Sequence, residues 1–142
     1  MDRRTFFKKG IGASVAVGSY LTLGGYKELF AYPPSAYDLV AVKGAEPDVM
    51  FDRGIEALGG MKAFVKKGQK VVVKPNIGWD VSPERAGNTN PKLVSRIISH
   101  CLNAGAKEVY VVDHTCDEWT RCYKNSGIEK TVKDVGGKIA PG

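Results

Sequence analysis

Four side chains of the kinds that bind metals lie within a short stretch of the sequence. They are Asp113, His114, Cys116 and Cys122, and the first of them ends a predicted strand. Carboxylate, imidazole and thiolate groups are the ligands that transition metals take in proteins, and a loop lets neighbouring side chains turn toward one centre. We therefore predict a metal or redox centre here, with redox or metal-assisted chemistry.

The spacing of the cysteines leaves a second interpretation open. Cys116 and Cys122 are six positions apart, unlike the closely spaced pairs of a zinc ribbon, and no second pair follows them. A short disulfide between them is the alternative, and it would staple the loop without forming a metal site. Cys101 lies on the apolar face of a predicted helix, where we expect it to be buried.

A second group of polar residues points to an anionic ligand. Lys74 and Asn76 follow one predicted strand, and Thr89 and Asn90 precede a helix that begins with Pro91. The free amides of a helix N-terminus, with a lysine nearby, bind carboxylates and phosphates. The alternative is that Asn90 only caps its helix and that Lys74 is a solvated strand end.

Both groups depend on the elements that carry them. Strands are predicted where β-branched or apolar runs occur, and helices where apolar residues keep a helical spacing. Their alternation predicts an α/β fold, a three-layer sandwich with a mostly parallel sheet and right-handed crossovers. Ligands bind such sheets at the carboxyl ends of the strands, so both groups are expected at one edge. The predicted strands are 37–43, 70–74, 108–113 and 138–140, and the predicted helices are 47–64 with a break at Gly59-Gly60, 91–104 and 127–135.

Two further expectations concern the sheet and its connections. The run Val71-Val72-Val73 is typical of a strand buried on both faces of a parallel sheet. The polar loop 76–90 has a length that, in compact domains, usually indicates a functional or a disordered segment. Because the fourth strand begins so close to residue 142, we expect residues 38–142 to form only the N-terminal part of a larger α/β domain.

The N-terminus has the layout of an export signal. Arg3 and Arg4 precede two phenylalanines and a modestly apolar, glycine-containing stretch, which resembles the twin-arginine motif. We predict a signal peptide over residues 1–31 and a linker over residues 32–37. The expected partner is the twin-arginine export machinery, and the expected location is periplasmic or extracytoplasmic. An uncleaved signal that tethers the chain to the membrane is the alternative.

The charge distribution argues against a nucleic-acid partner. The chain has 142 residues and a formal net charge of +6, with 25% charged and 43% hydrophobic residues. Five basic and two acidic residues fall in the first 31, so that segment carries half of the net charge. The remaining basic residues are scattered, and no basic patch interleaved with aromatic residues occurs.

Four motifs in order resemble the family called domain of unknown function 362. They begin at Val71-Val72-Val73-Lys74-Pro75-Asn76, and the similarity runs from about Val40 to the end of the chain. The resemblance implies an α/β fold, about half of the family's usual length, and a relation to members that carry iron–sulfur segments, so an iron–sulfur cluster joins a transition metal as an expected cofactor. The other three motifs are Asn88-Thr89-Asn90-Pro91, Ala104-Gly105-Ala106-Lys107 and Asp113-His114-Thr115-Cys116.

Three functional hypotheses follow. The first is an exported protein with a metal or redox centre at the strand ends. The second is a module that binds a small anionic molecule through Lys74 and Asn76. The third is a structural half-domain stapled by a disulfide between Cys116 and Cys122.

Overall fold

The computed structural model describes residues 37–140 of the chain. The predicted signal peptide, with Arg3 and Arg4, lies outside the described residues. Within the described range, no helix combines the length and the apolar character needed to cross a membrane.

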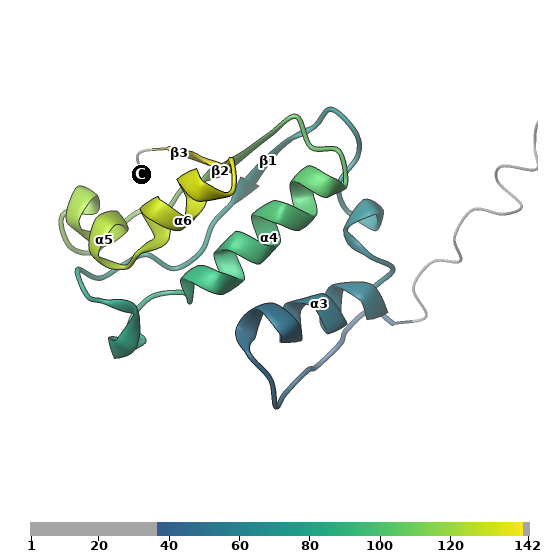
Figure 1. Cartoon of the computed structure of the whole chain (residues 1–142), viewed down its shortest axis with the longest axis horizontal. Coiled ribbons are helices and arrows are strands. Elements are labelled where there is room, and N and C mark those ends of the chain that lie inside the picture. Colours follow the sequence, from purple (N-terminus) through teal and green to yellow (C-terminus); the bar gives the residue numbers. More distant parts are fainter. Residues whose placement is uncertain (1–36, 141–142) are drawn as a thin grey trace, which may run out of the picture. The chain divides into compact units, whose positions relative to one another are not determined.

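The sheet is parallel and three-stranded over the described residues. Its strands are β1 (Lys70–Val73), β2 (Glu108–Val111) and β3 (Lys138–Ile139), in the order β1-β2-β3 (Figure 1). Val71 pairs with Val109, and Val111 pairs with Ile139. The predicted α/β class and parallel sheet are therefore confirmed.

Helices connect the strands at the positions that local signals indicate. Asn90 caps α4 by accepting a hydrogen bond from the Lys92 amide at 2.9 Å, and Gly105 follows its end with a φ of +101°. The predicted break at Gly59-Gly60 separates α3 from a short 3-10 turn. The bounds are α3 (Pro47–Ala57), η2 (Met61–Ala63), η3 (Pro83–Arg85), α4 (Pro91–Asn103), α5 (Trp119–Asn125) and α6 (Ile128–Asp134).

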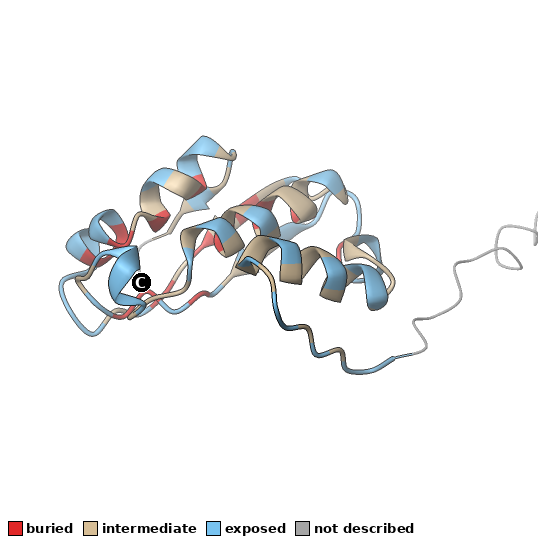
Figure 2. Cartoon of the chain, turned by 60° about the horizontal axis from the view of Figure 1, so that its bottom comes forward, coloured by how far each residue is buried: buried red, intermediate tan, exposed pale blue. Residues whose placement is uncertain are grey.

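The core lies between the sheet and α4 with α6. Val109 and Val111 point to this face of β2, where they meet Ile98 from α4 and Val132 from α6, and all four are fully buried (Figure 2). Alternate residues of a strand face opposite sides of its sheet, so the strands contribute every second residue to this core.

The opposite face of the sheet is open among the described residues. Val72 is 64% exposed, so the expectation that its strand is buried on both faces is wrong. The cause is the strand order. When each crossover moves to the next neighbour with the same hand, every crossover helix falls on the same face. The described residues thus supply the sheet and one helical layer of the predicted sandwich.

The predicted first strand at 37–43 is also wrong. This segment pairs with no other strand in the described structure, and Leu39 is 84% exposed. Its alternation serves a different contact, because Val40 and Val42 line an apolar groove together with Met50 and Phe51 of α3. The segment therefore covers a helix instead of extending the sheet.

Candidate functional site

Two loops meet at the carboxyl ends of β1 and β2, and we call residues 74–90 and 112–118 the strand-end edge. The backbone amides of Cys116 and Asp117 donate to the Gly78 carbonyl at 2.9 and 3.2 Å. The Asp80 amide donates to the Asp117 carboxylate at 3.0 Å. The edge on which both groups of predicted residues were expected is therefore a real junction between two loops.

Asp113 is the buried centre of this junction. Its side chain is 4% exposed, and its Oδ2 accepts a hydrogen bond from the Ile77 amide at 2.7 Å. The Lys74 ammonium lies 2.5 Å from Oδ1 and is itself 69% exposed. The Tyr123 hydroxyl of α5 accepts the Asp113 backbone N–H at 2.6 Å. One carboxylate thus ties the first loop to the end of β2.

The surroundings of Asp113 keep it ionised. Burial raises the pKa of this carboxyl. The hydrogen bonds from Lys74 and the Ile77 amide, together with the Lys74 charge, lower the pKa by more than burial raises it, so it lies below its usual value. Both oxygens already have partners, and a metal would have to displace a backbone amide or an ammonium to reach them.

Cys116 and Cys122 are free thiols, and both residues contact the Gly78 carbonyl oxygen, Cys116 through its backbone amide and Cys122 through its sulfur. The Cys122 sulfur, which is buried, lies 3.7 Å from the Gly78 carbonyl oxygen, the oxygen that also accepts the amide of exposed Cys116. Burial raises the pKa of the Cys122 thiol. The structure contains no disulfide between the two, in contrast to the staple considered above. Cys101, which is part of α4, is buried as expected.

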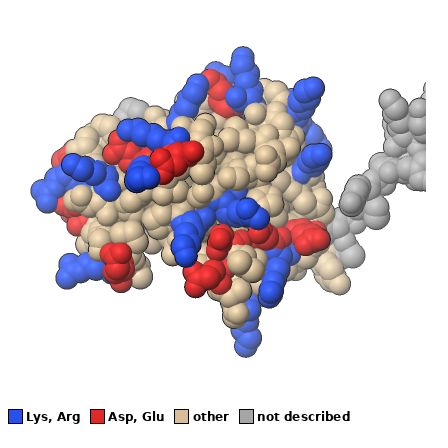
Figure 3. Space-filling model, in the orientation of Figure 1, with Lys and Arg blue, Asp and Glu red and all other residues tan. Residues whose placement is uncertain are grey.

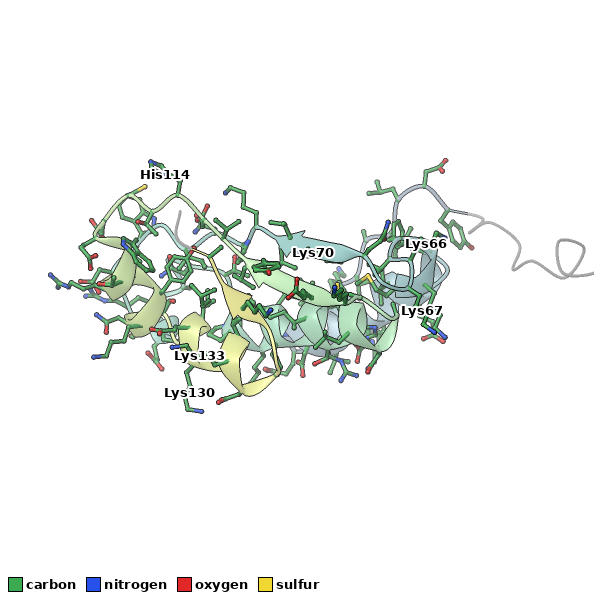
Figure 4. The ribbon with its side chains drawn as sticks, turned by 90° about the horizontal axis from the view of Figure 1, so that it is seen from above. Lys66, Lys67, Lys70, His114, Lys130 and Lys133 are labelled. Atoms are coloured by element: carbon green, nitrogen blue, oxygen red, sulfur yellow. The ribbon has the colours of Figure 1, made fainter. Side chains whose placement is uncertain are left out.

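The structure does not bring the four predicted metal ligands together. Among residues 37–140, no three His, Cys, Asp or Glu side chains are placed to hold a metal ion. The reason is strand geometry, because neighbours at a strand end point to opposite sides: Asp113 faces the interior, whereas His114 is exposed and points outward (Figure 4). The cysteines do not supply the usual ligand set of an iron–sulfur cluster either, because such a cluster ordinarily takes four thiolates and the chain has three cysteines, of which Cys101 lies in the core.

The residues predicted to bind an anion mostly hold the first loop in shape. The Asn76 amide donates to the Thr89 hydroxyl at 2.9 Å, the Thr89 amide donates to the Asn76 carbonyl at 2.8 Å, and the Asn76 side chain donates to the Gly87 carbonyl at 3.0 Å. Asn90 caps α4, as its alternative interpretation held. The alternative for Lys74 was a solvated strand end. Its ammonium is instead paired with the Asp113 carboxylate.

Comparison with known protein families finds one family that matches the chain. A family described as a domain of unknown function, DUF362, matches residues 71–141. The chain belongs to the DUF362 family. No curated protein and no solved structure matches it. The match begins inside β1 and includes both loops of the strand-end edge, so the junction around Asp113 belongs to the DUF362 segment.

Sequence reasoning missed one element that borders the strand-end edge, helix α5. The Glu118 side chain caps this helix by accepting hydrogen bonds from the amides of Thr120 and Arg121 at 3.1 and 2.9 Å. Glutamate is not one of the preferred N-cap residues, so the sequence did not indicate that a helix begins here. The helical spacing of Cys122, Tyr123 and Ser126, which are all buried, was the available sign.

Helix α5 also closes the junction from its far side. Arg121 and Asn125 both bind the Asp80 carboxylate, each at 2.5 Å. The helix therefore clamps the first loop while it supplies Tyr123 and Cys122 to the site. The candidate site is built from three segments, the two loops and α5.

Proposed function

We propose that this DUF362 chain is an exported protein in which Cys116 of the strand-end edge and Cys122 of α5 form a redox pair of thiols. The observation that supports the proposal is that the Cys116 backbone amide and the Cys122 sulfur both contact the Gly78 carbonyl oxygen, while one residue is exposed and the other is buried. An exposed thiol can attack a substrate, and a buried neighbour can resolve the intermediate without competing for the same substrate.

The proposed reaction is thiol–disulfide exchange. The Cys116 thiolate attacks a substrate disulfide, forms a mixed disulfide and releases one substrate thiolate. Cys122 loses its proton to solvent, attacks the Cys116 sulfur and releases the second substrate sulfur. Two electrons pass to the substrate, whose disulfide becomes two thiols, and the protein gains an internal disulfide. Because burial raises the pKa of Cys122, we assign the first attack to Cys116.

The test is a redox titration of the full chain, with Cys101→Ala as the background so that only the pair contributes. Defined glutathione ratios should convert both thiols together into one internal disulfide, with a midpoint between about −120 and −270 mV. Cys116→Ser and Cys122→Ser should each abolish the two-thiol change. A midpoint below about −300 mV would indicate a structural staple, and a Cys116–glutathione adduct without an internal disulfide would refute the pair.

The proposed location follows from the N-terminal motif. Disulfides persist in the periplasm, so exchange chemistry suits a protein exported there by the twin-arginine machinery. Replacing Arg3 and Arg4 with lysine should retain the chain in the cytoplasm. In the control, replacing Lys8 and Lys9 with arginine should leave export unchanged. Recovery of the wild-type chain in the membrane fraction would support the tether, and its export despite the arginine change would contradict the route.

A second candidate function rests on Lys74, an exposed ammonium fixed by a buried carboxylate. An ammonium has three donors, and Asp113 uses one of them, so a carboxylate or phosphate could accept from the others. Phosphate or citrate should then raise the melting temperature, and Lys74→Gln should remove the effect while Lys107→Gln keeps it. Equal effects in both variants would point to general screening by salt.

A further inference from the structure

A basic surface lies at the end of the sheet opposite the strand-end edge. Figure 4 shows Lys66 and Lys67 at this end and His114 at the other. Three short segments form the surface, namely the η2 turn, residues 66–69 and residues 104–107. We call it the lysine–phenylalanine patch. Its members are all exposed, and they are Lys62, Phe64, Lys66, Lys67 and Lys107.

Backbone contacts hold the turns of the patch side by side. The Gly68 amide donates to the Gly105 carbonyl at 2.7 Å, and the Lys107 amide donates to the Gln69 carbonyl at 2.8 Å. Lys67 lies so close to Gly105 that a Cβ on this glycine would be 3.2 Å from the Lys67 Cα. Lysines that are far apart in the sequence therefore share one surface.

The positive charge of the patch is not neutralised by the described part of the chain. The sequence has no Asp or Glu from residue 57 to residue 79, and none of the four lysines forms an ion pair with a carboxylate of residues 37–140. Neighbouring lysines differ, because Lys70 and Lys138 both pair with Glu108. Over the helical face, too, Figure 3 shows basic side chains beside acidic ones. The patch is thus set apart by unpaired lysines.

Phe64 adds an exposed aromatic ring to these charges. Its side chain is 58% exposed, whereas Val65 next to it is buried and anchors the turn. The Lys66 ammonium lies 3.5 Å from the Lys62 carbonyl oxygen, so it is held close to the turn that carries the ring. An aromatic ring among lysines suits the boundary between lipid headgroups and acyl chains. A single ring does not provide the successive stacking positions of a nucleic-acid site.

We propose that the lysine–phenylalanine patch binds the surface of an anionic lipid bilayer. The Phe64 ring enters the interfacial region, and the lysine ammonium groups bind the phosphates of the lipid headgroups. In this orientation the strand-end edge, at the opposite end of the sheet, stays open to solvent. The proposal depends neither on the thiol pair nor on an uncleaved signal.

The first test is co-sedimentation of the full chain with vesicles of phosphatidylcholine mixed with phosphatidylglycerol. Every variant keeps residues 1–36, so any binding by that segment cancels in the comparison. A triple glutamine variant of the patch should bind at least about ten-fold more weakly, because each lysine at an anionic surface contributes about five-fold. A matched variant on α5 and α6 should change binding less than about two-fold, and equal binding by the two variants would overturn the proposal. The two are Lys62→Gln/Lys66→Gln/Lys67→Gln and Lys124→Gln/Lys130→Gln/Lys133→Gln.

A second pair of variants tests the aromatic ring. Phe64→Ala should weaken binding to the same vesicles about three- to ten-fold, because apolar area that the bilayer covers is lost. Val72→Ala is the control, since Val72 is similarly exposed but lies on the sheet, and it should leave binding unchanged. Equal effects of the two changes would contradict the role of the ring.

The surface that faces the bilayer can be located directly. With lipids that carry a nitroxide on the headgroup, the amide NMR signals of residues 62–67 and 105–107 should broaden more than those of residues 114–118. Equal or stronger broadening at 114–118 would show that another surface faces the lipid and would refute the proposal. Binding to polyglutamate without binding to the anionic vesicles would assign the patch to an acidic protein partner and would overturn it as well.

Discussion

Replacing Asp113 with asparagine should destabilise the fold more than any change at its exposed partner. Asparagine keeps the shape of the side chain, and its oxygen can still accept the Ile77 amide. Its NH₂ group, however, replaces the oxygen that faces Lys74, so two donors then meet where a charge pair stood 2.5 Å apart. The change removes one charge-assisted hydrogen bond and reduces the other to a neutral one.

The magnitude follows from burial on each side of the pair. A hydrogen bond to a charged group contributes about 1.5–3 kcal/mol, and a neutral one about 1 kcal/mol. The Lys74 side is discounted to less than about 1 kcal/mol because the ammonium is 69% exposed to water. We therefore expect a loss of about 0.5–3 kcal/mol for Asp113→Asn. Lys74→Met should lose less than about 1 kcal/mol.

The assay is equilibrium unfolding in urea at a series of pH values. The pKa of Asp113 is lower in the folded chain than in the unfolded one. Its ionisation therefore stabilises the fold above the unfolded value of about 3.9, and that contribution is lost as the pH falls through the folded pKa. The gap between wild type and Asp113→Asn should be full at pH 7 and shrink in acid. A loss below about 0.5 kcal/mol at pH 7, or a gap that does not change with pH, would refute this account of the junction.

Three further predictions test the fold. Gly137→Ala should cost about 1–3 kcal/mol in urea unfolding, because its new Cβ would lie 2.9 Å from Val132 Cγ1; a neutral result would mean that the turn yields easily. Asn90→Ala should cost about 1 kcal/mol through the lost cap of α4, while Asn90→Ser should restore most of it. Val111→Ala should cost about 2 kcal/mol, because Val111 is buried, and Val72→Ala should cost less than about 0.5 kcal/mol, because Val72 is exposed on the neighbouring strand. Similar losses in the two variants would contradict the open face of the sheet.

The elements that sequence predicts well are those with local causes. The first turn of α4 follows from Asn90 and Pro91 alone, since a side-chain cap and a fixed proline φ act within one turn. The strand at 108–111 follows from its apolar run, and its helix-connected neighbour must lie parallel to it. The α/β class could therefore be predicted without knowledge of any long-range contact.

The errors concern partners that are distant in the sequence. The alternation in 37–43 is real, but a strand also needs a neighbour, and no local signal says whether Val40 and Val42 will meet a sheet or a helix. The exposure of Val72 depends on the order in which later strands are added, which a β-branched run does not encode. Both outcomes are set by topology.

In the candidate site, too, some features follow from local sequence and others depend on distant contacts. This difference explains which of its residues have groups available for chemistry. The position of the strand-end edge was predictable, because parallel strands end together. The roles of its side chains were not, because the first loop passes close to the core and its backbone groups need partners. Asp113 and Asn76 meet that need, so they cannot also bind a ligand without loss of structure. The functions proposed above therefore rest on other groups, the thiols of Cys116 and Cys122 and the remaining donors of the Lys74 ammonium.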